Sequence, residues 1–209
     1  MQLNQLLSRA FSILALSAAG LLAASASAQT QNYIELTPPQ PSDTAGKVEV
    51  LEFFAYTCPH CKTMEPLVAN WAKTLPDNVV VRPVPVAFNA SMADLQRMYY
   101  TLESLDRLDL HNAFFRAIHD ERKRLFDAKA MAAWAAEQGI DNQTFEGVFK
   151  SFGVNTKVSR ANELAKAYKV EGTPTLAIGG RYVTSPSMNS SYEATITQAQ
   201  ALLDRVLKN

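Results

Sequence analysis

The chain has 209 residues and a balanced charge, with 20 lysines and arginines against 20 aspartates and glutamates. This balance gives no electrostatic reason to expect nucleic acid or an anionic membrane surface as a partner. We therefore expect partners to be recognised through shape and apolar contact. A chain of this length buries enough apolar surface to fold without disulfide staples, so its two cysteines are not needed as scaffolding.

Residues 1–28 have the three parts of a secretory signal peptide. A single basic residue, Arg9, precedes the apolar run 10–22, and the small residues 26–28 follow. The run is too short to cross a bilayer as a helix. We expect cleavage after Ala28 and export from the cytosol, to a compartment where thiols tend to be oxidised.

The two cysteines lie between the first expected strand and the first expected helix. Residues 47–54 (KVEVLEFF) have the composition of a strand that is buried on both faces of a sheet. After Thr57 the apolar residues recur at helical spacing, and Pro59 suits the first turn of a helix. Pro66 falls inside this helix and is expected to kink it. Cys58 therefore stands where a strand gives way to a helix.

Residues 79–86 form the next expected strand, which makes a right-handed βαβ unit with the first strand. Residues 91–153 carry no strand signal, and we expect them to form an all-helical insertion. The amphipathic stretches of this insertion are 95–105, 110–122, 127–138 and 144–152. Asp127 has the position of an N-cap in the third stretch, and Gly139 has the position of its C-terminal stop.

The strand pattern returns after the insertion. The expected elements are a helix at 159–168, strands at 175–178 and 181–184, and a helix at 191–207. Gly179 and Gly180 predict a tight hairpin turn between the two strands. Ser190 and Glu193 have the spacing of a capping box for the last helix. The fold class is therefore α/β, as one domain with a helical insertion.

The only two cysteines stand in the sequence CPHC at positions 58 and 61. A disulfide that closes so small a ring is a weak and strained staple, so a purely structural bridge is disfavoured. Structural zinc needs four cysteine or histidine ligands, and the remaining candidates are His60, His111 and His119. We place His111 and His119 on exposed faces of the insertion and expect no metal site.

The spacing favours a redox-active pair instead. A thiolate at a helix N-terminus accepts hydrogen bonds from unpaired N–H groups and lies at the positive end of the helix dipole. We expect a lowered pKa for Cys58, with His60 adding to the stabilisation of its thiolate. Cys61 lies one turn inside the helix and is expected to be shielded. A stabilised thiolate favours the reduced protein, which makes the disulfide a stronger oxidant.

The stretch EFFAYTCPHC, the downstream helices and the later Thr-Pro together resemble the DsbA family of periplasmic thiol:disulfide oxidoreductases. The resemblance covers about residues 47–209. It implies a thioredoxin-like fold in two parts, residues 29–90 and 154–209, with the helical domain 91–153 inserted between them. It also implies a periplasmic location and no organic or metal cofactor.

The resemblance assigns roles around the cysteines by position. Cys58 corresponds to the exposed nucleophile and Cys61 to the buried resolving thiol. Pro59 and His60 form the dipeptide that tunes both thiols. Glu52 has the position of the buried acid that accepts a proton from Cys61, and burying a carboxylate within a strand is costly enough to favour such a role over an ordinary strand-end position.

Thr173 and Pro174 correspond to the family's cis-proline element. This element packs against the disulfide and presents main-chain groups to an extended substrate. Thr173 stands where the best-known DsbA has valine, which bears on substrate preference. Glu65 falls where the family carries a charged residue, and a solvated helix position explains it equally well.

These features predict a dithiol oxidase that passes the Cys58–Cys61 disulfide to newly exported proteins through a mixed disulfide. Its expected partners are folding proteins with free thiols and a DsbB-type membrane quinone reductase that re-oxidises it. We expect a monomer and no nucleic acid partner. A reductase or isomerase of the same fold is the nearest alternative, and a non-catalytic client-binding protein with a structural disulfide is the second.

Overall fold

The computed structural model describes residues 32–208, so the expected signal peptide and its cleavage after Ala28 lie outside the described part. Five strands in this part form one mixed sheet, in the order β1-β5-β4-β2-β3. They are β1 (Ile34–Glu35), β2 (Val48–Phe54), β3 (Val79–Pro85), β4 (Thr175–Ile178) and β5 (Tyr182–Thr184). No helix within residues 32–208 is long and apolar enough to cross a membrane.

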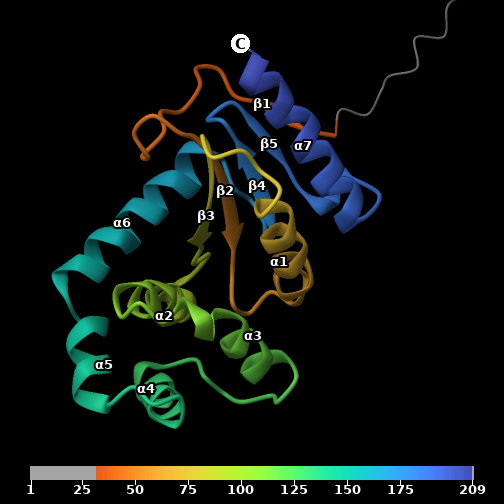
Figure 1. Cartoon of the computed structure of the whole chain (residues 1–209). Coiled ribbons are helices and arrows are strands. Elements are labelled where there is room, and N and C mark those ends of the chain that lie inside the picture. Colours follow the sequence, from red (N-terminus) through yellow and green to blue (C-terminus); the bar gives the residue numbers. More distant parts are fainter. Residues whose placement is uncertain (1–31, 209) are drawn as a thin grey trace, which may run out of the picture. The chain divides into compact units, whose positions relative to one another are not determined.

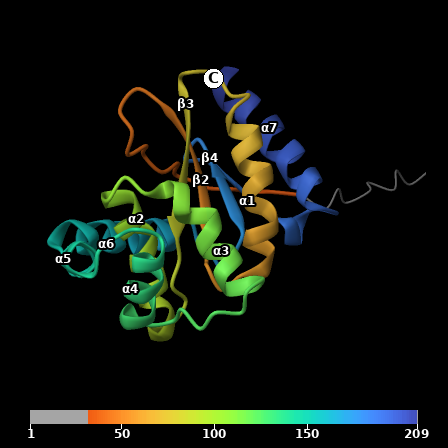
Figure 2. The same cartoon turned by 60° about the horizontal axis from the view of Figure 1, so that its bottom comes forward.

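The helices cover both faces of the sheet. They are α1 (Pro59–Ala72), α2 (Ala93–Ser104), α3 (His111–His119), α4 (Ala128–Glu137), α5 (Asn142–Phe149), α6 (Phe152–Ala167) and α7 (Tyr192–Lys208), with short 3-10 helices η1 (Ala90–Met92), η2 (Leu108–Leu110) and η3 (Pro186–Met188). Helices α1 and α7 lie together on one face, and α6 lies on the other (Figures 1 and 2). Helices α2 to α5 gather near the end of the sheet at which β2 gives way to α1 (Figure 1).

The pairing of β2 brings two distant segments of the chain together at one end of the sheet. β2 runs parallel to β3, which confirms that the two strands and α1 form a βαβ unit, and antiparallel to β4. Phe53 near the end of β2 lies opposite Thr175 at the start of β4. Two segments therefore meet at the same end of the sheet. One is the turn after β2, which contains Cys58, and the other is the segment before β4, which contains Pro174.

Each face of the sheet has its own hydrophobic core. The core under α1 and α7 includes Val50, Met64, Val68, Leu176 and Leu202. The core on the opposite face includes Phe53, Phe54, Phe114, Phe115, Trp134 and Phe149. Burial of one such large apolar side chain contributes about 1.5–3 kcal/mol. The aromatic residues of helices α3 to α5 are therefore part of the core, and Phe115 of α3 packs against Phe54 of β2.

Several helix ends are confirmed and others are wrong by a few residues. Asp127 caps α4 by accepting a hydrogen bond from the Ala130 N–H, and Gly139 follows this helix with φ 84°. The expected cap Ser190 is wrong, because the hydroxyl of Ser191 accepts the Ala194 N–H at 3.0 Å. A capping side chain reaches two or three residues forward, so neighbouring serines are hard to distinguish from sequence.

Two elements differ from the expected pattern. Helix α6 begins at Phe152 rather than near residue 159, because Ser151 caps it by accepting the Val154 N–H at 3.2 Å. Strand β1 was not expected, since residues 29–45 have the composition of an extended lead-in. It is only two residues long and depends on its pairing with β5 rather than on its own sequence.

The β4–β5 turn is the hairpin expected from the two glycines, and it contacts the lead-in before β2. Gly179 and Gly180 have φ values of 57° and 72°, a region that favours glycine. The N–H of Gln40 donates to the carbonyl of Gly180 at 2.8 Å. A Cβ at Gly180 would lie 2.0 Å from the Gln40 carbonyl oxygen, so this close contact itself requires glycine.

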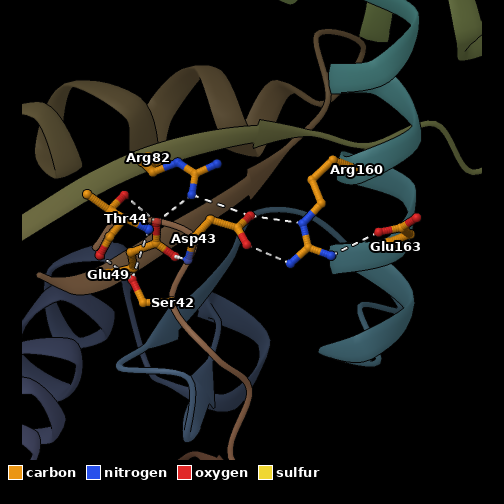
Figure 3. Close-up of polar contacts among 7 residues, drawn as sticks. All are labelled: Ser42, Asp43, Thr44, Glu49, Arg82, Arg160 and Glu163. Atoms are coloured by element: carbon orange, nitrogen blue, oxygen red, sulfur yellow. Dashed lines mark hydrogen bonds and ion pairs between the residues drawn. The ribbon is translucent and has the colours of Figure 1, made fainter. Parts of the chain in front are cut away.

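An ion-pair network fixes the same lead-in to β2, β3 and α6 (Figure 3). Glu49 on β2 is 3% exposed and accepts hydrogen bonds from Thr44, from the Asp43 N–H and from Arg82. Asp43 also pairs with Arg160 of α6, with contacts of 2.7 and 2.9 Å. Burial alone would raise the pKa of Glu49, but these three hydrogen bonds hold it below its usual value.

Candidate active site

Cys58 is the N-cap of helix α1. Its backbone is extended, and its sulfur accepts a hydrogen bond from the Cys61 N–H at 3.3 Å. Pro59 occupies the first turn, where its missing N–H leaves no hydrogen bond unmade. Cys58 is half-buried and Cys61 is 0% exposed. The pair therefore combines one accessible sulfur with one that solvent does not reach.

The pKa values of the two thiols are shifted in opposite directions. The pKa of Cys58 is lowered to about 5, chiefly by the hydrogen bond from the Cys61 thiol, with burial opposing the shift. The Thr173 side chain and the backbone N–H groups of Cys61 and His60 lower it further. The pKa of Cys61 is raised by burial and by its hydrogen bond to Cys58. The reduced pair therefore holds its negative charge on Cys58, which is the sulfur that a partner can reach.

Thr173 and Pro174 lie beside the accessible sulfur. The peptide bond between them is cis, and Pro174 is buried. The Cys58 sulfur lies 3.3 Å from the Thr173 carbonyl oxygen, to which it donates a hydrogen bond only in its protonated form. The antiparallel register of β2 and β4 explains this contact, because it places the residues before β4 next to the turn after β2.

The His60 side chain forms a hydrogen bond with helix α7 rather than with Cys58. Its Nδ1 lies 2.6 Å from the hydroxyl of Tyr192, the first residue of α7. The contribution of His60 to the low pKa of Cys58 comes from its backbone N–H. Tyr192 was not predicted as a site residue, because nothing in the sequence indicates that the start of α7 reaches the cysteine pair.

A groove opens next to the cysteines and has a volume of about 670 Å³. It is lined by Ile34, His60, residues 169–175, Val183, residues 185–188 and residues 190–192. The segment with the cis proline forms one wall, and the start of α7 forms another. Its volume and its largely apolar lining suit a peptide segment bound beside the accessible sulfur.

Glu52 is a buried acid on β2, near enough to Glu65 of α1 for the two charges to interact. It is 4% exposed, and its Oε1 has no hydrogen-bond partner within the described residues. Burial raises the pKa of Glu52 to about 8, and the charge of Glu65 adds to the increase. Glu65 is itself half-buried with a raised pKa, which an Asn112 side chain moderates. A carboxyl group that is neutral near pH 7 is suited to proton transfer.

His111 and His119 hold the turn before Cys58, and the expectation that both lie on exposed faces is wrong. His111 is buried, and its Nδ1 lies 2.7 Å from the Tyr56 hydroxyl. His119 is half-buried, and its Nε2 lies 2.8 Å from the Tyr56 carbonyl oxygen. The four-residue spacing of His111, Phe115 and His119 could have revealed this shared face of α3.

The site is suited to thiol–disulfide exchange. It has an acidic and accessible thiol, a buried partner thiol, a neutral buried acid and a peptide-sized groove. Within residues 32–208, no group of three or more histidine, cysteine, aspartate or glutamate side chains is placed to hold a metal ion. The chemistry that these residues can perform by themselves is the making and breaking of one S–S bond.

Comparison with known proteins agrees with this chemistry. The DSBA-like thioredoxin domain model matches residues 49–195. The thiol:disulfide interchange protein DsbA of Bordetella parapertussis is 59% identical over 173 residues, which cover 82% of this chain and 83% of that protein. The DsbA of Pseudomonas aeruginosa is 36% identical over 176 residues, which cover 84% and 83%.

Solved structures give the same result. The crystal structure of P. aeruginosa DsbA has a TM-score of 0.79 at 36% identity and covers 83% of this chain and 91% of that chain. The structure of DsbA from Xylella fastidiosa has a TM-score of 0.79 at 27% identity, with 85% and 96% covered. These matches confirm the thioredoxin-like α/β fold. The chain belongs to the DSBA-like thioredoxin domain family and is a thiol:disulfide oxidoreductase.

Proposed function

We propose that this oxidoreductase is a periplasmic dithiol oxidase that gives its Cys58–Cys61 disulfide to newly exported proteins. The observation that supports this direction is the low pKa of Cys58, about 5. Each unit by which the pKa falls stabilises the thiolate by about 1.4 kcal/mol. Because only the reduced protein has this thiolate, the same energy favours reduction of the enzyme and therefore oxidation of its client.

The reaction proceeds through a mixed disulfide. A client thiolate attacks the Cys58 sulfur, the Cys58–Cys61 bond breaks, and Cys61 leaves with the bonding electron pair. A second client thiolate then attacks the client sulfur of the mixed disulfide, and Cys58 leaves as a thiolate. The client loses two electrons and gains a disulfide, while the enzyme gains two electrons and becomes a dithiol.

Glu52 serves as the proton relay of Cys61 in this proposal. The leaving Cys61 becomes a thiol, since burial disfavours its anion. Glu52 is buried with a pKa of about 8, so it carries a proton at neutral pH and can supply it. In the reverse step, when the enzyme is re-oxidised, the same carboxylate accepts the proton of Cys61. Pro59 and His60 at the start of α1 tune the thiolate, and the His60 N–H lowers the pKa of Cys58.

Thr173 and Pro174 form the substrate-binding wall in this proposal. The Thr173 carbonyl lies 3.3 Å from the Cys58 sulfur and is a hydrogen-bond acceptor for the main chain of a client. An extended client in the groove would present its cysteine to Cys58 and align its backbone with the residues before β4. Recognition through main-chain groups allows many different sequences to be accepted.

The remaining parts of the proposal concern location and partners. The signal peptide over residues 1–28, cleaved after Ala28, would deliver the chain to the periplasm. Re-oxidation there would require a quinone-linked membrane protein of the DsbB type. We propose that the enzyme acts as a monomer and needs neither a cofactor nor nucleic acid. Its helical domain, residues 91–153, would be an insertion between the two thioredoxin-like parts 29–90 and 154–209.

A redox titration against glutathione tests the direction of the reaction. We expect an equilibrium far on the oxidising side of thioredoxin, whose potential is about −270 mV. A value near that of thioredoxin would favour the reductase alternative. Exchange of Cys58 for alanine should abolish oxidation of a reduced model protein, and Cys61→Ala should trap clients as mixed disulfides. A protein that only binds clients would keep its activity in both variants.

A further inference from the structure

The hydrogen bond between His60 and Tyr192 connects the CPHC sequence to the start of α7. Nδ1 of His60 and the Tyr192 hydroxyl are 2.6 Å apart, and the ring centroids are 6.2 Å apart. Tyr192 is half-buried, since its ring packs against the core beneath α7, and this packing fixes its hydroxyl. His60 is exposed. The position of the imidazole therefore depends on Tyr192.

The hydrogen bond to Tyr192 holds the His60 imidazole away from the sulfur of Cys58. Among residues 32–208, His60 and Cys58 share no side-chain hydrogen bond, although the backbone N–H of His60 acts on the thiolate. A protonated imidazole that donated to the thiolate would form a charge-assisted hydrogen bond, about twice as strong as a neutral one. While Tyr192 holds the ring, the thiolate lacks this additional stabilisation.

The same two rings line the groove in which a client would lie. His60 and Tyr192 contribute to its wall together with Thr173 and Pro174. An extended peptide carries an N–H and a C=O at almost every residue, and a tyrosine hydroxyl both donates and accepts. A client segment that passes the start of α7 can therefore take over the hydroxyl of Tyr192 and leave His60 without it.

We propose that Tyr192 is a positioning residue that holds the His60 imidazole on the groove side, and that a client in the groove releases this imidazole to Cys58. The inference rests on the proposed function in one respect, that clients bind in this groove. The released ring stabilises Cys58 as the leaving thiolate when the second client thiolate attacks the mixed disulfide. The exchange itself is unchanged in its electrons and protons, and only the departure of Cys58 is accelerated.

The Tyr192→Phe variant tests the first part of this inference, that Tyr192 holds the His60 imidazole when no client is bound. It removes the hydroxyl but keeps the ring, so the imidazole is free without a client. We expect the ratio of thiolate to thiol at Cys58 to rise about tenfold at a given acidic pH, read from the ultraviolet absorbance of the thiolate. Tyr182→Phe is the matched control, because Tyr182 packs in the same core and lies on β5 away from His60, and it should leave the titration unchanged.

A His60→Ala background separates positioning from a structural effect. If Tyr192 acts through the imidazole, Tyr192→Phe should have no effect on the Cys58 titration once His60 is alanine. A shift that persists in this background, or one that Tyr182→Phe reproduces, would overturn the inference. An unchanged or raised Cys58 pKa in Tyr192→Phe alone would overturn it as well.

A thiol-free peptide tests the client-driven half. We would use a short apolar peptide with serine in place of the client cysteine, and follow the thiolate absorbance together with the ¹⁵N signal of the His60 ring. The peptide should raise the thiolate fraction of the wild type and shift its Nδ1 signal, and it should do neither in Tyr192→Phe. Equal responses in both proteins would contradict the release step. The proposed function is judged separately, from the glutathione equilibrium of the wild type, so either idea can fail without the other.

Discussion

The hydroxyl of Tyr56 lies 2.7 Å from Nδ1 of His111, in a buried contact between the turn before Cys58 and helix α3. Burial lowers the pKa of His111 to about 4, so its ring is neutral and accepts the hydrogen bond from Tyr56. Around this pair, Phe54 packs edge-on against His111 and Phe115 packs edge-on against Tyr56. A helix outside the sheet therefore holds the turn that positions the reactive cysteine.

His111 should make the protein acid-sensitive. An ordinary histidine has a pKa of 6.5, and the folded value is about 4, so below pH 6.5 the unfolded chain binds a proton that the folded protein does not. The free energy of unfolding should fall by up to about 3 kcal/mol as the pH drops from 6.5 to 4. Urea denaturation at several pH values measures it. His111→Gln should flatten this fall, whereas Tyr56→Phe, which keeps the histidine, should retain it at a cost of about 1 kcal/mol.

Glu52 should make the protein less stable as the pH rises. Its folded pKa of about 8 exceeds the ordinary 4.5, so the folded protein keeps a proton that the unfolded chain loses between these values. The cost at pH 7 is about 3 kcal/mol, and Glu52→Gln should recover much of it. The same variant should slow re-oxidation, because Cys61 loses its proton acceptor. A Glu52→Gln protein with unchanged stability at pH 7 would show that the carboxyl group is not buried as described.

Cys61 should control the acidity of its neighbour. The Cys61 thiol is the largest cause of the lowered pKa of Cys58, so Cys61→Ala should raise the Cys58 value well above about 5. Thiolate absorbance against pH gives both midpoints. The variant should still titrate below an ordinary cysteine, since the helix N-terminus and the His60 N–H are retained. Identical midpoints in the two proteins would assign the effect to the helix alone.

Arg82 and Arg160 of the ion-pair network should contribute different amounts to the free energy of unfolding. Arg82 pairs with Glu49, which is 3% exposed, so Arg82→Met leaves a buried carboxylate poorly compensated and should cost about 3 kcal/mol. Arg160 joins more exposed partners, Asp43 and Glu163, and Arg160→Met should cost less than about 1 kcal/mol. Urea denaturation of the two variants at low salt decides the question. Similar losses for both would mean that burial of Glu49 is not the determining factor.

Local features of the chain were readable from the sequence. Cys58 at the start of a helix, Gly179 and Gly180 in a hairpin, and Asp127 as a cap all follow from rules that act within a few residues. The short-range pattern also indicated the alternation of strands and helices around the insertion. These predictions succeeded because the residues concerned need no distant partner to adopt their conformation.

Contacts between distant segments could not be predicted from the sequence in the same way. His60 with Tyr192 and Tyr56 with His111 join residues far apart in the chain, and composition does not indicate which elements will meet. Strand β1 is too short to have a pattern of its own, and it exists because β5 lies beside it. The polar partners of the site therefore became visible only when the sheet order was known.

The N-terminal segment with β1 pairs with strand β5 from the C-terminal part of the chain, and this pairing bears on the proposed export. Ile34 of β1 pairs with Val183 of β5, and Gln40 binds the tip of the β4–β5 hairpin. If the chain is exported N-terminus first, as proposed above, β1 cannot pair with β5 until residues 182–184 have crossed the membrane. The β1–β5 edge of the sheet would then close only after most of the chain has been translocated.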